Sequence, residues 1–400
     1  MAGHELVIAG GGLTAARAIK AYREAGGGGR IALVGREATL PYHRPPLSKR
    51  YLRGESSETP FVEDEAFYRE HDVDVLLGAA VAGVEADRRA VTLDDGARLR
   101  YARLLVATGA VPRVLWVAGN ELDGVFALRT VADSAAIREA ANAAERAVVV
   151  GGGFIGMEAA ASLRALGLDV TLIHLGRGLF DQLGSSELSD QLVNLYRERR
   201  VDLLLESEVA SFGGDGALTH VETKSGIRIS ADLAVIGVGV LPSVDFLEGS
   251  GIEVDNGVVV NARFEASTPG VYAAGDVANV FDPLFGRRRR IEHWSNASYQ
   301  GTQVGRVLAG AEGGFDHVSS FFSEVFGTTI KAFGDVGRFD TLRTEGSLNE
   351  GFLAAYGNEG RFVGAVTAGQ SEELETLVTE LIAERAPADA LEAELIGERQ

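Results

Sequence analysis

The 400-residue chain contains no cysteine. A thiolate nucleophile, a redox dithiol, a cysteine-held zinc ion and an iron–sulfur cluster all need cysteine sulfur, so this sequence can build none of them. The seven histidines are scattered without the spacing of metal ligands, and we expect no metal site. Any redox chemistry therefore needs a cofactor that the chain binds.

Positive charge is also scarce. The 38 basic side chains stand against 57 acidic ones, which gives a formal net charge of −19. Because such a surface repels phosphate backbones and anionic lipids, we expect neither nucleic acid nor a membrane as a partner. Met1 leads directly into an apolar run at 5–9 without a basic and apolar leader, which favours a cytoplasmic location.

Proline is rare and glycine abundant, with nine prolines against 51 glycines, and the glycines cluster after apolar runs. Two segments, 5–19 and 146–163, share one pattern: a β-branched run, three glycines and an alanine-rich stretch. A second matching pair, 104–113 and 233–243, follows at similar offsets. The sequence therefore predicts an α/β fold with two tandem Rossmann-like dinucleotide-binding domains.

The glycine turns predict two dinucleotide sites. A glycine turn between a strand and a helix lets backbone N–H groups reach a pyrophosphate at the positive end of the helix dipole. The alternative is that such a turn only packs a helix on a sheet, but two turns in the same context favour binding. The two turns are Gly10-x-Gly12-x-x-Ala15 and Gly151-x-Gly153-x-x-Gly156.

A residue shortly after the second strand of each unit indicates whether the ribose of the bound dinucleotide has a free hydroxyl or a 2′-phosphate. Glu37 lies where an acid that binds a free ribose hydroxyl is expected. The second unit has His174 at the corresponding position, with Arg177 three residues later. Basic groups there can pair with a 2′-phosphate, which favours NADPH over NADH, although a solvent-facing histidine and an ordinary surface arginine would explain them almost as well.

Five motifs, in order along nearly the whole chain, resemble one family. They are PYHRPPLSK at 41–49, ATG at 107–109, GGGFIGMEAA at 151–160, VYAAGDVA at 271–278 and EHWSNASYQG at 292–301. This combination is similar to the FAD-dependent, pyridine-nucleotide-linked ferredoxin reductases. That family includes the reductases of putidaredoxin, rubredoxin and aromatic-dioxygenase ferredoxins, and the apoptosis-inducing-factor-like flavoproteins.

The resemblance implies a glutathione-reductase-like architecture with FAD and NADPH or NADH as cofactors. An FAD domain would comprise 1–115 and 240–318, an NAD(P)H domain 116–239, and a carboxy-terminal α+β domain 319–400. Within the last of these, the segment 371–386 has the pattern of an amphipathic helix.

Residue by residue, the resemblance implies that Arg44 and Pro45 lie beside FAD and that Lys49 lies close to the flavin ring. Lys49 would pair with Glu158 from the nicotinamide side, and these two would be the catalytic residues. The pairing makes physical sense, because a buried carboxylate needs a cation. Without the surrounding motif, Lys49 would simply be a solvated loop cation. The ATG motif adds Thr108 and Gly109 to the cofactor-binding residues.

Further cofactor contacts are implied in the second half of the chain. Gly275 and Asp276 would serve the flavin ribityl chain and pyrophosphate, although Asp276 could equally cap a helix. Trp294 would form a wall beside the isoalloxazine, where an isolated tryptophan would usually fill a core. Many relatives carry an FWSDQ-like stretch; here it is FFSEVF at 321–326, with Phe322 as a smaller ring cover. This departure weakens any transfer of acceptor identity.

The function that the resemblance implies is an NAD(P)H:ferredoxin reductase, since flavin can take a hydride and release single electrons to an iron–sulfur protein. Two alternatives remain open. One is a reductase of a small acceptor such as a quinone or monodehydroascorbate. The other is a redox-responsive interaction protein of the apoptosis-inducing-factor type.

Four consecutive arginines, Arg287, Arg288, Arg289 and Arg290, form the densest positive charge in the chain. Because small ferredoxins are commonly acidic, this run is a candidate docking patch. The alternative is a solvated hairpin whose arginines pair with the protein's own acids. The sequence leaves open whether the protein is a monomer or a homodimer.

Overall fold

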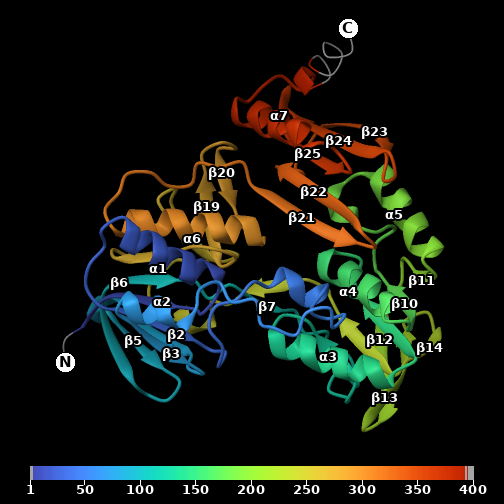
Figure 1. Cartoon of the computed structure of the whole chain (residues 1–400), viewed down its shortest axis with the longest axis horizontal. Helices are drawn as coiled ribbons and strands as arrows, with labels where there is room; N and C mark the ends of the chain where they lie inside the picture. The colour runs from blue at the N-terminus through green and yellow to red at the C-terminus, as the bar shows by residue number, and fades with distance from the viewer. Residues whose placement is uncertain (1–2, 392–393, 395–400) are drawn as a thin grey trace. The chain divides into compact units, whose positions relative to one another are not determined.

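The computed structural model describes residues 3–391 and 394, and the chain divides into two compact units (Figure 1). Each unit is assembled from segments far apart in the sequence. The chain crosses between the units within β7 (Ala110–Pro112) and β16 (Val240–Pro242), among other places. The first unit holds the residues up to His43, Thr59–Val111 and Leu241–Ser319, and the second holds Arg44–Glu58, Pro112–Val240 and the residues from Ser320 onward.

The first unit is built on a sheet of strand order β3-β2-β1-β6-β5-β4, with β18 beside β6. The strands β3, β2, β1, β6 and β18 run parallel, whereas β4 and β5 form an antiparallel extension. The strands are β1 (His4–Ala9), β2 (Ile31–Gly35), β3 (Val73–Leu77), β4 (Val81–Glu85), β5 (Ala90–Leu93), β6 (Arg98–Val106) and β18 (Val271–Ala273). The central strands are buried on both faces, which explains why they read as continuous apolar runs.

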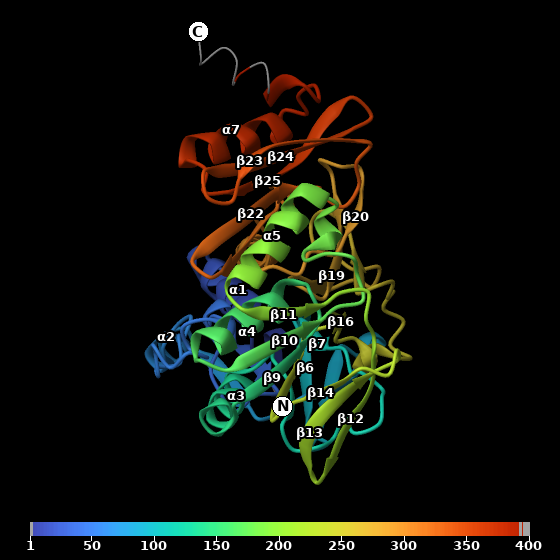
Figure 2. The ribbon, with the colours of Figure 1, turned by 90° about the vertical axis from the view of Figure 1, so that its right-hand side faces the viewer.

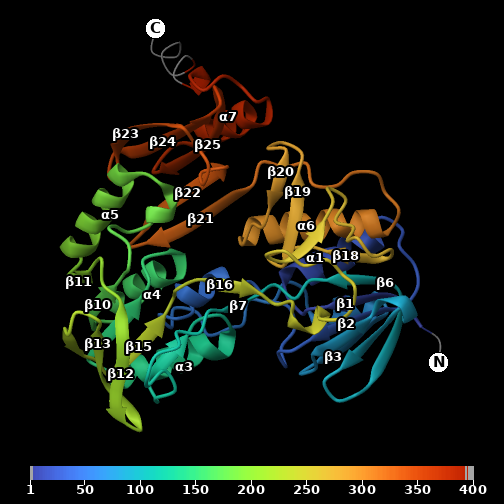
Figure 3. The same cartoon turned by 180° about the vertical axis from the view of Figure 1, so that it is seen from behind.

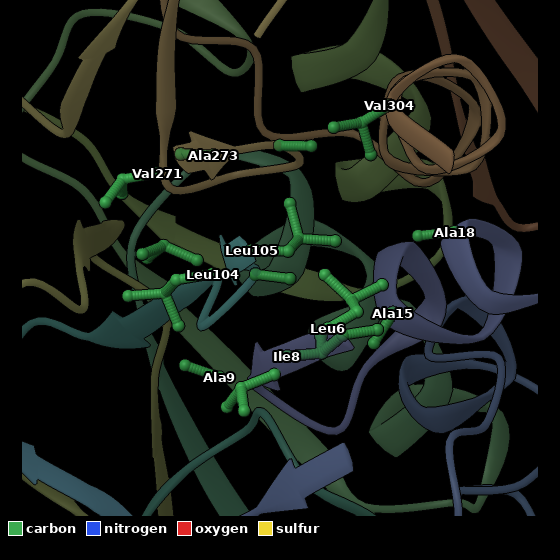
Figure 4. Packing of buried hydrophobic residues seen from close by; sticks show 14 of the residues in the cluster. Leu6, Ile8, Ala9, Ala15, Ala18, Leu104, Leu105, Val271, Ala273 and Val304 are labelled. Carbon is green, nitrogen blue, oxygen red and sulfur yellow. The ribbon is translucent and has the colours of Figure 1, made fainter. Parts of the chain in front are cut away.

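Helices α1 (Leu13–Glu24) and α6 (Trp294–Leu308) pack against each other over this sheet, and α2 (Glu65–Glu70) packs on β3. Figure 4 shows Leu6 of β1, Leu105 of β6, Ala15 of α1 and Val304 of α6 in one apolar cluster. A small sheet of β17 (Val258–Val260), β19 (Ala278–Asp282) and β20 (Arg287–Arg289) lies in the same unit (Figure 3).

Two glycines on α6 explain how closely it approaches α1. A Cβ atom on Gly301 would lie 2.6 Å from the carbonyl oxygen of Thr14, and one on Gly305 would lie 2.4 Å from that of Ala18. Real Cβ contacts are not this short, so any other residue would push the helices apart. The Thr14 hydroxyl donates a hydrogen bond to the Ala297 carbonyl at 3.2 Å, which further ties the start of α1 to α6.

The second unit contains a fully parallel sheet of order β11-β10-β9-β15-β8. Its strands are β8 (Val125–Ala127), β9 (Arg146–Val150), β10 (Asp169–Ile173), β11 (Val201–Leu204) and β15 (Leu233–Ile236). Its helices are α3 (Val131–Ala143), α4 (Phe154–Ala165) and α5 (Ser186–Glu198), and a ribbon of β12 (Val209–Asp215), β13 (Ala217–Thr223) and β14 (Arg228–Ser230) joins the unit. The two tandem Rossmann-like units that the repeat predicts are thereby confirmed.

An antiparallel sheet of order β21-β22-β25-β24-β23 completes the second unit. Helix α7 (Glu372–Ala383) covers it and buries Val378, Leu381 and Ile382, in line with the amphipathic pattern (Figure 2). The strands are β21 (Ser320–Val325), β22 (Thr328–Gly334), β23 (Thr341–Ser347), β24 (Gly351–Asn358) and β25 (Arg361–Ala368). A separate domain of 319–400 stays a prediction. Among residues 3–391 and 394, no helix is both long and apolar enough to cross a membrane.

Candidate functional site

The first glycine turn combines one tight contact with one open position. Gly10 has a φ of +120°, and a Cβ atom there would lie 2.2 Å from the Ala107 carbonyl oxygen, so glycine is required where β1 ends beside β6. A Cβ atom on Gly12, at the start of α1, would meet nothing within 4 Å. Strand β1 lies between β2 and β6, which is the topological switch point where α/β proteins bind ligands. The turn therefore fits a pyrophosphate. Ala15, in the third motif position, is buried.

Glu37 and Thr108 lie near the ends of neighbouring strands in the same unit. The Glu37 carboxylate accepts a hydrogen bond from the hydroxyl of buried Tyr42 at 2.5 Å, which orients it at the end of β2. The Thr108 hydroxyl donates to the Ser243 carbonyl at 2.7 Å, and Gly109 follows with a φ of +67°. These contacts fix the loops at the edge of the sheet where the first turn lies.

Asp276 lies in a turn that leads into β19, so the expectation that it begins or caps a helix is wrong. The Gly275–Asp276 turn rests directly on α1 and α6. The Gly275 N–H donates to the side-chain oxygen of Gln300 at 2.8 Å, and a Cβ atom on Gly275 would lie 2.4 Å from the Thr14 hydroxyl. Within the described part of the chain, Gln300 Nε2 and Asn296 Oδ1 are buried without a hydrogen-bond partner. Buried polar groups are normally satisfied, so these atoms fit a bound polar ligand. Both lie inside the motif at 292–301, although neither stands out from it by residue type.

Trp294 is held at the surface. Its Nε1–H donates to His43 Nδ1 at 2.9 Å, and 38% of the residue is exposed. Burial lowers the pKa of His43 and Arg17 lowers it further, while Glu63 partly opposes them. A neutral His43 can keep accepting this hydrogen bond, and so Trp294 is a fixed, accessible ring and not a core filler.

The second glycine turn, between β9 and α4, repeats the geometry of the first. Gly151 has a φ of +118°, and its Cβ atom would lie 2.3 Å from the Gly237 carbonyl oxygen. A Cβ atom on Gly156 would lie 2.0 Å from the Gly151 oxygen, which explains the third glycine of the motif. Gly153 is the N-cap of α4 and has no side-chain cap. The turn can therefore approach a second dinucleotide.

His174 lies beneath this turn. Its Nδ1 accepts the Gly152 N–H at 3.0 Å, and its Nε2 lies 3.3 Å from Asp181 Oδ2, with 16% of the side chain exposed. The ring therefore supports the turn. Arg177 is different, because 92% of its side chain is exposed and its ion pair at 3.3 Å is with the exposed Glu206. Of the two basic residues, Arg177 is the one available to a 2′-phosphate.

The structure brings Lys49 and Glu158 together in the second unit, with Nζ 2.6 Å from Oε2 and side chains that are 11% and 5% exposed. Lys49 follows a short 3₁₀ helix (Pro45–Ser48) that begins with two prolines, and its Nζ also donates to the Pro45 carbonyl at 3.3 Å. Arg44 donates to the Arg129 carbonyl at 2.5 Å and anchors the start of this segment. A buried ion pair of this kind has to be held by further hydrogen bonds.

Two serines complete the surroundings of the Glu158 carboxylate. Ser48 Oγ donates to Oε2 at 2.5 Å, and Ser323 Oγ of β21 donates to Oε1 at 2.7 Å. Burial and the nearby Glu158 together raise the pKa of Tyr196 well above its ordinary value. The Phe322 ring, 40% exposed, has its centroid 5.9 Å from Lys49 Nζ. Both serines lie in stretches that carry the family resemblance, at 41–49 and 321–326, but their residue type does not reveal the contact with Glu158.

The arginine run forms β20 and the residue after it, and both Arg289 and Arg290 form ion pairs with the protein's own acids. Arg289 pairs with the fully buried Asp282 at 2.9 Å. Arg290 pairs with Glu292 and donates to the Asp276 carbonyl at 3.2 Å. Arg288 is exposed, although it also donates to a backbone carbonyl, and Arg287 is half-buried. For Arg289 and Arg290, the pairing with the protein's own acids is what the structure shows.

Two Rossmann-like units, each with a glycine turn that fits a dinucleotide, are typical of a pyridine-nucleotide-linked flavoprotein. A family model described as pyridine nucleotide-disulphide oxidoreductase matches residues 4–301, and the chain belongs to this family. It is an FAD-dependent oxidoreductase that uses NAD(P)H, as the motifs imply. Because the chain has no cysteine, it lacks the dithiol to which the family's description refers.

The similarity to ferredoxin reductases extends over nearly the whole chain. The sequence is 34% identical to a ferredoxin–NAD(P)+ reductase of a Sphingomonas species, covering 90% of this chain and 88% of the relative. It is 31% identical to putidaredoxin reductase of Pseudomonas putida, covering 99% and 95%. The structure matches a chain in the crystal structure of the covalent putidaredoxin reductase–putidaredoxin complex with a TM-score of 0.92, at 31% identity and coverages of 97% and 94%. The family resemblance is confirmed.

His293 makes stability depend on pH. Burial lowers its pKa from 6.5 to about 4, with Arg289 adding to the effect and Asp276 opposing it. Between these values the unfolded chain binds a proton that the folded protein excludes, so stability is complete above about pH 6.5 and falls as the pH drops toward 4. The loss should reach at most ~3 kcal/mol. Urea unfolding from pH 4.5 to 7 should show this slope, and His293→Gln should flatten it while His220→Gln does not. Equal slopes in all three proteins would contradict the assignment.

Proposed function

We propose that this protein is an FAD-dependent NAD(P)H:ferredoxin reductase. The observation that carries the proposal is the pair of glycine turns in a chain without cysteine. Because this chain has no dithiol that could relay electrons, electrons from a pyridine nucleotide must leave the flavin directly for the acceptor. Bound FAD supplies the conversion of a hydride into single electrons that an iron–sulfur protein can accept. The full-length similarity to reductases named for ferredoxin and putidaredoxin supports this choice of partner.

The chain's own residues would bind the two cofactors and orient them toward each other. Gly10 and Gly12 would bring the start of α1 to the FAD pyrophosphate, while Asp276 and Gln300 would offer polar groups to the ribityl chain. Following the family resemblance, Lys49 would lie beside the flavin ring and Glu158 would orient the nicotinamide. Holding both reactants in place lowers the entropic part of the barrier. The rings of Trp294 and Phe322 are both accessible, with 38% and 40% of the residues exposed.

Removing the Asp276 carboxylate should release flavin. In Asp276→Ala the affinity for FAD should fall by about one to two decades, the usual value of a hydrogen bond that involves a charged group. Flavin absorbance after dialysis, together with a titration of the apoprotein, measures the effect. The control is Asp87→Ala in an exposed turn of the same unit. Full retention of FAD in Asp276→Ala would remove Asp276 from the site.

Coenzyme choice should depend on Arg177. We propose that NADPH competes with or outperforms NADH because the Arg177 guanidinium can pair with the 2′-phosphate, and its ion pair with exposed Glu206 is weak enough to exchange. Arg177→Gln should raise the KM for NADPH about tenfold. NADH is the internal control, since it lacks the phosphate. A wild type that strongly prefers NADH, or equal changes for both coenzymes, would refute this role.

The surface charge of Arg287 and Arg288 should guide an acidic ferredoxin to the protein. We propose these two for docking because Arg288 is exposed and Arg287 is only half-buried. Changing both to Gln should raise the KM for an acidic ferredoxin about three- to tenfold at low ionic strength, with a smaller effect at high salt. Ferricyanide reduction should be unaffected, because a small acceptor needs no docking patch.

The matched control for the docking test is Arg88→Gln, which removes an exposed charge elsewhere in the same unit. A parallel loss of ferredoxin and ferricyanide activity would show that Arg287 and Arg288 are structural. Rapid turnover with quinones and none with any ferredoxin would overturn the ferredoxin reductase assignment itself.

A further inference from the structure

The Glu158 carboxylate is shared by three segments of the second unit. Lys49 and Ser48, at the end of the 3₁₀ helix, contact Oε2, while Ser323 of β21 donates to Oε1. Both serines are buried, with 3% and 0% of their surface exposed. Each carboxylate oxygen therefore has a donor, and the two oxygens are held from different directions. This satisfies a charge that would be costly to bury with one partner only.

The segment that carries Ser48 is itself fixed by hydroxyl groups. Ser162, one turn beyond Glu158 on α4, donates to the Ser48 carbonyl at 2.6 Å. Ser134 of α3 donates to the Leu47 carbonyl at 2.6 Å. Because both bonds are short and buried, the position of Lys49 is set by the two helices. The donors that meet Oε2 are therefore held in place by α3 and α4, but these two hydrogen bonds do not fix the rotation of the Glu158 carboxylate itself.

Ser323 is the contact that comes from the carboxy-terminal sheet. Along β21, Ser323 and Val325 are fully buried, whereas Phe322 between Phe321 and Ser323 is 40% exposed, as expected for alternating faces of a strand. Phe321 packs edge-on against Phe154 at the start of α4, with ring centroids 4.8 Å apart. The inward face of β21 is thus placed on the same helix that carries Glu158, which brings the Ser323 hydroxyl to Oε1.

We infer that Ser323 is a positioning residue: its hydroxyl fixes the rotation of the Glu158 carboxylate and thereby the contact of that carboxylate with Lys49. Without it, Oε1 loses its hydrogen bond to β21 and the carboxylate can turn. The inference rests on the proposed role of Lys49 and Glu158 in hydride transfer. It makes that step depend on a residue 165 positions away in sequence from Glu158.

The first test measures flavin reduction by NAD(P)H in anaerobic stopped-flow experiments on the FAD-loaded protein. Ser323→Ala should lower the limiting rate about tenfold, with little change in the coenzyme concentration that gives half the limiting rate, because the carboxylate is still present but misplaced. Ser323→Thr keeps the hydroxyl and should restore most of the rate. FAD content should be unchanged in both variants.

Ser185→Ala is the matched control. Ser185 is also buried and caps α5 through a hydrogen bond from the Leu188 N–H, whereas the serines that donate to Glu158 are Ser48 and Ser323. This variant should lose stability through its missing cap while it keeps the wild-type rate of flavin reduction. If Ser185→Ala slows reduction as much as Ser323→Ala does, general destabilisation explains the effect and the inference fails.

The second test needs no activity. Urea unfolding of wild type, Ser323→Ala, Glu158→Ala and the double variant forms a thermodynamic cycle. Ser323→Ala should lower the unfolding midpoint in the wild-type background and lower it much less once Glu158 is absent. Equal shifts in both backgrounds would show that Ser323 acts through packing alone.

The two proposals fail in different ways. If Glu158→Gln slows flavin reduction while Ser323→Ala leaves it unchanged, only the positioning role of Ser323 is overturned. If Glu158→Gln itself leaves reduction unchanged, the proposed role of the ion pair is wrong, and the inference that depends on it is wrong as well.

Discussion

The architecture depends on backbone segments that touch without side chains between them. At Gly10 and at Gly151, the end of a central strand lies so close to the neighbouring strand that a Cβ atom would fall 2.2 or 2.3 Å from a carbonyl oxygen. In each unit this contact lies at the turn that leads from the central strand into the following helix. On α6, Gly301 and Gly305 extend the same principle to helix packing and bring the Gly275–Asp276 turn against α1. At these positions glycine therefore permits close packing of backbone on backbone.

The buried charge at Glu158 presents a second constraint, of the opposite kind. A close contact between backbones leaves no room for a side chain, whereas a buried carboxylate needs side-chain donors around it. Here the donors to Glu158 come from the 3₁₀ helix and from β21. Such a group is costly unless every partner is in place. The pair therefore ties segments far apart in the chain into one arrangement, and it stays compatible with a reaction in which the cofactors supply the chemistry and the protein supplies positions.

In both units, basic residues that are neighbours in the sequence have different surroundings in the structure. In a chain with a net charge of −19, the four arginines look from sequence like one positive patch. The strand geometry divides them: Arg289 lies over the buried Asp282 and Arg290 turns toward Glu292, while Arg288 remains exposed. His174 and Arg177 divide in the same way, since one supports a turn and the other faces solvent.

The sequence by itself determined the tandem Rossmann-like fold, the two glycine turns and the family, because these depend on local patterns: strand, glycine and helix in a fixed order within about 30 residues. The motifs also located Lys49, Glu158, Asp276 and Trp294. Only the tertiary structure decided which neighbours these residues have. Four further residues matter because of their surroundings in the folded chain. Hydrogen-bond partners 25 to 165 positions away single out Ser48, Ser323 and Gln300, and a buried polar atom without a partner singles out Gln300 and Asn296. All four lie in stretches that resemble the family, but the residue type of a serine or an amide does not reveal which distant group it will contact, since distant segments meet only when the whole core packs.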